Sequence, residues 1–130
     1  MVGVVMRCGS GDSYIDNHSA GGDTSIVDVE TGRVISCTSS KWELIVVRHP
    51  DTGVIFPDIQ ISNWDKTITM VKEAAASLEG IRYTNWDVAF IHVDVCLLEA
   101  NPSRDPVVLQ EPTQRGVKEL YDWMLSELKK

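Results

Sequence analysis

Residues 86–90 read WDVAF, and after a short reversal residues 95–101 read VCLLEAN. Both runs are largely apolar, and apolar runs of this length bounded by a turn predict β-strands. Two such strands joined by a tight turn form a hairpin, which would bring Asp87 next to Glu99 and Asn101. Glu99 and Asn101 are two residues apart, so a strand places both on the same face. The sequence therefore predicts three oxygen-bearing side chains at one end of a hairpin.

These three side chains have the chemistry of a magnesium site. Mg²⁺ prefers carboxylate, amide and phosphate oxygens and normally takes only one or two protein carboxylates. Asp87, Glu99 and Asn101 are therefore candidate metal ligands. The alternative is a β-hairpin with a polar rim, in which Glu99 and Asn101 are ordinary strand-end and turn residues, since Asn101-Pro102 is typical of a turn. Spacing alone leaves both interpretations open.

The wider sequence resembles the ATP-grasp enzymes, and most closely their sugar-transfer-associated branch, which is related to glutamate ligases. The matching segments, in family order, are VMRCG (5–9), IDNHSAGG (15–22), DVETG (28–32), HPDTG (49–53), ISNW (61–64), and NWDVA (85–89) with LEAN (98–101). No single segment is specific, but six in register are. The resemblance covers residues 4 to 103 and is confined to the C-terminal half of that family's catalytic region.

The resemblance implies an ATP- and magnesium-binding portion of an ATP-dependent carboxylate–amine or carboxylate–thiol ligase. Residues 1–130 would then form a single domain similar to the C-terminal half of the catalytic region. In the family, the preceding half carries the lysines that grip the ATP phosphates, so the isolated chain is expected to be incomplete. Its partners would be a nucleotide, a small carboxylate or amine substrate, and a chain that supplies the missing lobe.

Residues 9–23 are rich in Gly, Ser, Asp and Asn and predict a long loop. Loops of this length are usually functional or disordered. In the family the matching segment approaches the nucleotide phosphates and the acceptor, which makes Asn17 and His18 candidates for phosphate or substrate binding. Arg7, just before the loop, is the candidate catalytic residue, because a guanidinium can stabilise the charge on a transferred phosphoryl group. The alternatives are an ordinary ion pair for Arg7 and simple exposure for His18.

A second hypothesis is a non-catalytic remnant that acts as an oligomerisation or interaction domain. Loss of a covering lobe should expose apolar patches or sheet edges, and such surfaces favour association. This interpretation predicts a homo-oligomer. A third is that the chain is a fragment of a longer protein and shares its function. Asp87, Glu99 and Asn101 favour the ligase-derived site, because an interaction module has no need for three converging oxygen ligands.

Composition is typical of a small soluble domain. Hydrophobic residues make up 43% of the 130 residues, and no apolar stretch approaches the roughly 20 residues of a membrane helix. The N-terminus has no signal pattern, so we expect a cytoplasmic protein without a membrane partner. The net charge of −7, with scattered basic residues, argues against nucleic-acid binding. Cys8, Cys37 and Cys96 predict neither a disulfide nor a zinc site, and Cys96 should lie in the core.

The remaining patterns predict an α+β fold, a largely antiparallel sheet of hairpins with two helices packed on one face. Alternation over residues 24–29 and 34–38 predicts a second hairpin. Apolar residues at helical spacing predict a helix from Trp64 to Gly80, capped by Asn63. A final helix is predicted over 113–129, capped by Thr113.

Overall fold

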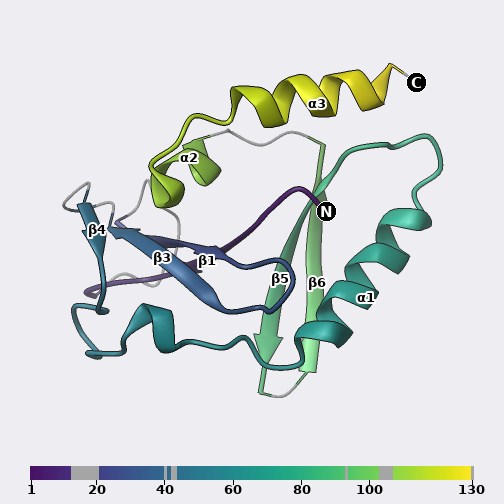
Figure 1. Ribbon diagram of the computed structural model, residues 1–130. Helices are drawn as coiled ribbons and strands as arrows, with labels where there is room; N and C mark the ends of the chain where they lie inside the picture. Colours follow the sequence, from purple (N-terminus) through teal and green to yellow (C-terminus); the bar gives the residue numbers. More distant parts are fainter. Residues whose placement is uncertain (13–20, 40, 42–43, 93, 103–106, 130) are drawn as a thin grey trace. The chain divides into compact units, whose positions relative to one another are not determined.

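The computed structural model describes residues 1–12, 21–39, 41, 44–92, 94–102 and 107–129. It confirms the antiparallel α+β class, with a four-stranded and a two-stranded sheet (Figure 1). The elements in chain order are β1 (Val4–Cys8), β2 (Asp23–Val27), β3 (Val34–Ser39), β4 (Leu44–Val46), η2 (Phe56–Asp58), α1 (Trp64–Ala76), β5 (Asn85–Ile91), β6 (Asp94–Asn101), α2 (Val107–Thr113) and α3 (Lys118–Leu128). The chain divides into two compact units, residues 1–61 with 106–120, and residues 62–105 with 121–130.

The first unit is built on the antiparallel sheet β1-β2-β3-β4. Strands β2 and β3 form the hairpin that was predicted over residues 24–29 and 34–38. Side-chain hydrogen bonds stabilise the turn between the two strands. The Asp28 carboxylate accepts hydrogen bonds from the backbone N–H of Glu30 and Thr31 and from the Thr31 hydroxyl. The hydroxyl bond, more than the others, lowers the pKa of the Asp28 carboxyl. Gly32 completes the turn with a positive φ of 73°, which glycine adopts without strain.

Helix α2 contacts β2 and β3 of this sheet. The hydroxyls of Ser36 and Thr38, which are on one face of β3, donate to the backbone carbonyls of Pro112 and Glu111. The sequence did not predict this helix, because Pro112 lies inside it and proline usually ends a helical pattern. Pro112 is in its last turn and is buried, where the missing N–H removes only one hydrogen bond.

The final helix exists, but it begins at Lys118 and not at Thr113. Thr113 ends α2 instead, where its hydroxyl donates to the Leu109 carbonyl at 2.6 Å. Gln114 then takes a left-handed conformation with φ of 52°, which is a common way to end a helix. The described residues therefore form three α-helices, one more than the sequence predicted.

The core of the first unit lies between the sheet and the η2 turn. Phe56 of η2 is 1% exposed, and Val27, Val34 and Cys37 are equally buried. The η2 turn contacts β3. The centroid of the Phe56 ring lies 6.0 Å from the centroid of the His49 ring. Apolar side chains of β2 and β3 are thus buried together with the short η2 turn.

Burial of Cys37 predicts a loss of stability at high pH. Removal from water, more than the nearby Asp23 charge, raises the pKa of the Cys37 thiol from 9.0 to about 11. The protonated thiol therefore contributes stability that is complete below pH 9 and is lost as the pH rises to about 11. We expect the free energy of unfolding to fall by about 1–3 kcal/mol across this range.

The measurement is urea denaturation at several pH values, with Cys37→Ala as the comparison. The variant has no thiol to ionise, so the part of the pH slope that belongs to Cys37 should be missing from its curve. Equal slopes for both proteins between pH 9 and 11 would contradict the assignment to this thiol.

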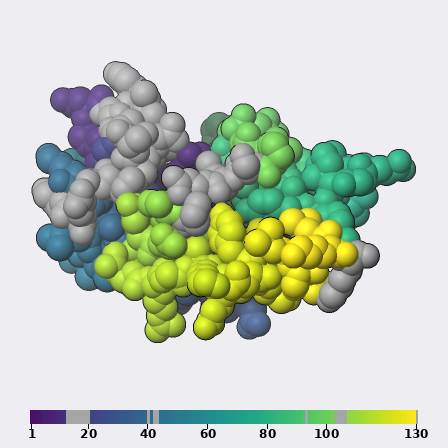
Figure 2. Space-filling model, turned by 90° about the horizontal axis from the view of Figure 1, so that it is seen from above, coloured from purple at the N-terminus to yellow at the C-terminus, as the bar shows by residue number. Residues whose placement is uncertain are grey.

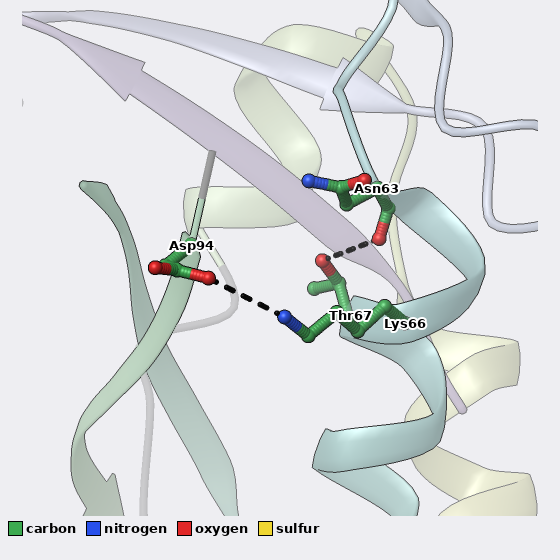
Figure 3. A network of polar contacts seen from close by, with 4 residues as sticks. All are labelled: Asn63, Lys66, Thr67 and Asp94. Atoms are coloured by element: carbon green, nitrogen blue, oxygen red, sulfur yellow. Dashed lines mark hydrogen bonds and ion pairs between the residues drawn. The ribbon is translucent and has the colours of Figure 1, made fainter. Parts of the chain in front are cut away.

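The second unit combines α1 with the β5–β6 hairpin, as Figures 1 and 3 show. Lys66 of α1 forms an exposed ion pair with Asp94 of β6, 3.5 Å between Nζ and Oδ1. The helix begins as predicted at Trp64, but Asn63 does not cap it through its side chain. Asn63 has a left-handed conformation, and its backbone carbonyl accepts hydrogen bonds from the N–H and hydroxyl of Thr67.

The prediction that Cys96 is a core residue is wrong, because Cys96 is exposed, and β6 also contains a β-bulge near it. Asp87 lies opposite Glu99, but the next pair is Val88 with Leu97, so Leu98 has no partner in β5. Such an extra residue shifts the side-chain alternation that follows it along the strand. Leu97 is half-buried, whereas Cys96 and Leu98 are both exposed, so Cys96 lies outside the core.

The final helix α3 lies at the surface in the view of Figure 2, where it is yellow. Its Met124 is buried, whereas Trp123 and Leu125 are more than half exposed. None of the helices formed by the described residues has the length and apolar character needed to cross a membrane.

Candidate functional site

The β5–β6 hairpin brings together the three predicted metal ligands. Asp87 of β5 is the direct cross-strand partner of Glu99 of β6, and Asn85 is the partner of Asn101. Directly opposite residues in antiparallel strands share a face, with Cβ atoms about 4.5–5.5 Å apart. Two carboxylates and two amides therefore occupy one end of one face, which we call the carboxylate–amide face (Asn85, Asp87, Glu99 and Asn101).

The hydrogen bond between Asn101 and Glu99 uses the amide nitrogen of Asn101, so the amide oxygen of Asn101 is still able to accept or bind a ligand. The Asn101 Nδ2 donates to Glu99 Oε1 at 2.9 Å, so the amide directs its nitrogen to the carboxylate and retains Oδ1 as an acceptor. Glu99 is exposed, and Asp87 and Asn101 are half-buried. The bond orients both side chains before any ligand arrives, which lowers the entropy that binding must overcome.

The donor set fits Mg²⁺ better than a softer metal. Among the described residues, no three His, Cys, Asp or Glu side chains are grouped so that they could hold a metal ion. A magnesium site does not need such a group, because Mg²⁺ is bound by one or two carboxylates and keeps water or phosphate oxygens on its other positions. The carboxylate–amide face offers two carboxylates, Asp87 and Glu99, and one neutral oxygen, Asn101 Oδ1.

Asn85 belongs to this face, and the sequence analysis did not assign it a role. Its Oδ1 accepts a hydrogen bond from the Tyr83 hydroxyl at 3.3 Å. Its Nδ2 is buried and has no hydrogen-bond partner within the described part of the chain. The available signal was its position two residues before Asp87, which on a strand means the same face.

Arg7 lies in β1, in the first unit, opposite the buried Thr24 of β2. The residues Asn17 and His18 lie outside those that the structure describes, as does most of the predicted loop 9–23, and β2 already begins at Asp23. The two ends of this segment meet, because the Ser10 hydroxyl donates to the Gly21 carbonyl at 2.9 Å.

His49 and Asp51 hold the first residues of the same segment. His49 Nε2 lies 3.0 Å from the Gly9 carbonyl oxygen, and the Asp51 carboxylate accepts from the Gly11 N–H at 2.7 Å. His49 Nδ1 accepts from the backbone N–H of Asp51 and Thr52, so the neutral ring donates through Nε2. Sequence reasoning missed these positioning roles, although both residues lie in the quoted HPDTG segment.

The described residues thus combine an antiparallel α+β fold with a cluster of carboxylate and amide oxygens on one face of the β5–β6 hairpin. The family model for sugar-transfer associated ATP-grasp matches residues 1–123, and the chain belongs to this family. Comparisons with curated proteins and with solved structures give no match. Family membership confirms the resemblance found in the sequence and indicates an ATP-binding domain of the ligase type.

Proposed function

We propose that this chain is the ATP- and magnesium-binding part of an ATP-dependent carboxylate–amine or carboxylate–thiol ligase. The observation that carries the proposal is the cross-strand pair Asp87 and Glu99, with Asn101 hydrogen-bonded to Glu99. Two facing carboxylates are mutually repulsive, and a divalent cation between them would remove that repulsion. Family membership supplies the nucleotide that such a cation would accompany.

Each residue of the face has a distinct role in this proposal. Mg²⁺, when bound, neutralises charge on the β- and γ-phosphates during phosphoryl transfer to a carboxylate. Asp87 and Glu99 would hold the cation through their charge, and Asn101 would add a neutral oxygen through Oδ1. The hydrogen bond from Asn101 keeps Glu99 in place, as partners of metal ligands commonly do.

Arg7, Asn17 and His18 are the proposed phosphate- and substrate-binding residues of the N-terminal part of the chain. The Arg7 guanidinium would bind oxygens of the transferred phosphoryl group, because its fixed fork of donors matches their geometry. Asn17 and His18 would contact the phosphates or the acceptor. His49 and Asp51 support them indirectly, since both fix the backbone of residues 9–11, where the segment that carries Asn17 and His18 begins.

Titration calorimetry of the chain with Mg²⁺ and ATP at millimolar concentration tests the proposal. We expect weak binding, because we propose that the chain corresponds to the C-terminal half of the catalytic region, and the phosphates are gripped by the other half in the family. Binding should require the metal, so ATP with an excess of chelator is the control. Absence of heat with Mg²⁺ and ATP would reject nucleotide binding by this chain and favour the second function below.

A second candidate function is self-association through the β4 edge. Strand β4 is an edge of the four-stranded sheet, and Leu44, Ile45, Val47 and Val54 in and beside it are each 47–63% exposed. An exposed apolar edge strand presents unpaired backbone groups to a second chain. We propose that two copies pair at this edge if the chain acts as an interaction domain.

Light scattering coupled to size exclusion tests self-association. The expected mass exceeds that of one chain, and Ile45→Lys should return it to the mass of one chain, because a lysine on an edge strand opposes strand pairing. Ile35, which is equally exposed but lies on the interior strand β3, provides the control variant Ile35→Lys. A wild-type mass equal to one chain would exclude this function.

A further inference from the structure

We infer that Asn85 is a ligand-binding residue of the same site and that its Nδ2 donates a hydrogen bond to a phosphate oxygen of the bound nucleotide. The inference rests on the proposed function, because it needs a phosphate next to the carboxylate–amide face. It adds a donor to a set that otherwise consists of oxygen ligands for the cation.

The first observation is the orphaned nitrogen. Asn85 Nδ2 is buried, and no residue of the described chain accepts a hydrogen bond from it. A buried donor without an acceptor costs about 1–3 kcal/mol, so native structures rarely retain one without a reason. The nitrogen of an amide cannot bind a cation, because it has no acceptor lone pair to offer. Its missing partner is therefore an oxygen acceptor.

The second observation is the orientation of the amide. The Tyr83 hydroxyl donates to Asn85 Oδ1, which assigns the other end of the amide as the free donor. The facing Asn101 uses its own Nδ2 on Glu99. Asn101 thus uses its amide nitrogen to orient Glu99, the proposed metal ligand. The amide nitrogen of Asn85 stays available to donate to a ligand outside the hairpin.

The third observation is the register. Asn85 lies two residues before Asp87 on the same strand, and it faces Asn101 across the hairpin. A phosphate held by a cation between Asp87 and Glu99 would bring its free oxygens to this end of the face. A phosphate oxygen is a charged acceptor, and hydrogen bonds to charged groups are about twice as strong as neutral ones. It would satisfy the donor for which the described residues offer no acceptor.

The test separates metal binding from nucleotide binding in Asn85→Ala and Asn85→Asp. Mn²⁺ alone, followed by water-proton relaxation, should bind Asn85→Ala as it binds the wild type. The affinity for ATP with Mg²⁺ should fall about 10-fold in Asn85→Ala, the loss expected for one charge-assisted hydrogen bond. Asn85→Asp is nearly isosteric but has no donor, so it should bind Mn²⁺ at least as well and the nucleotide at least 10-fold more weakly.

Two further readouts keep the inference falsifiable if a variant folds poorly. In the wild-type chain the ¹⁵N side-chain amide signals of Asn85 should shift when ATP and Mg²⁺ are added, but not when Mg²⁺ is added alone. Tyr83→Phe removes the hydroxyl that orients the amide and should weaken nucleotide binding less than Asn85→Ala does.

Nucleotide binding that is equal in wild type and Asn85→Ala overturns the inference but not the proposed function. A wild-type chain that binds neither Mn²⁺ nor nucleotide overturns both.

Discussion

Combining Asp87→Asn with Glu99→Gln is expected to lower the affinity for Mn²⁺ at least about 100-fold, because loss of even an indirect partner of a metal ligand costs 10–100-fold. Asp87 and Glu99 are direct cross-strand partners. The two substitutions therefore remove both negative charges from the same part of the carboxylate–amide face. Each substitution keeps the side-chain shape. The hairpin should therefore fold unchanged, and removing the repulsion between facing carboxylates should stabilise it slightly.

The measurement is paramagnetic broadening of the hairpin amide signals by Mn²⁺, followed by calorimetry with ATP and Mg²⁺. Asp94→Asn is the matched control, because Asp94 lies in the same hairpin and is 79% exposed in an ion pair with Lys66. Exposed pairs of this kind are worth about 0–1 kcal/mol, so this variant should bind Mn²⁺ as the wild type does. Equal affinity in the double variant would contradict the assignment of the metal site to this face.

Asp23→Asn is expected to raise the free energy of unfolding by about 1–4 kcal/mol, because a buried carboxylate that no described residue hydrogen-bonds carries a desolvation penalty of several kcal/mol. Asp23 is fully buried in β2, between Cys8 of β1 and Ser39 of β3. Neither of its carboxylate oxygens has a hydrogen-bond partner among the described residues. Asparagine has nearly the same shape but no charge to desolvate, so the strand should keep its register.

Urea denaturation of wild type and variant at pH 8 measures this change. Asp58→Asn is the control in the same unit, because Asp58 is exposed in η2, and surface substitutions usually change stability by less than about 0.5 kcal/mol. A loss of stability in Asp23→Asn would indicate that the carboxylate holds a cationic partner in the folded protein.

Local pattern was sufficient to predict the hairpin and its acidic pair. Apolar runs on either side of a short reversal predicted β5 and β6, and the i, i+2 rule placed Glu99 with Asn101 on one face. The structure pairs Asp87 with Glu99 as expected. Strand periodicity is a local property, so it can be read without knowledge of the rest of the chain. The same holds for the Asp28 turn and for the start of α1 at Trp64.

Other features depend on contacts that are distant in sequence. Cys96 is exposed although it lies in an apolar run, and β6 has a bulge at Leu98; no residue in the VCLLEAN run signals either feature. Helix α2 forms despite Pro112, where two β3 hydroxyls, from Ser36 and Thr38, reach its last carbonyls. His49 and Asp51 lie about 40 positions from the backbone groups that they hold. Propensity and spacing carry no information about such partners.

The sequence by itself determined the antiparallel α+β class, the ATP-grasp family, and the meeting of Asp87, Glu99 and Asn101 at one end of a hairpin. Each of these follows from short-range periodicity or from motifs in fixed order. Only the tertiary structure decided that the Asn85 donor and the Asp23 carboxylate are buried with no hydrogen-bond partner among the described residues, and that Cys96 lies outside the core. Burial and hydrogen-bond satisfaction are properties of the assembled chain, because they depend on which distant residues exclude water from each atom.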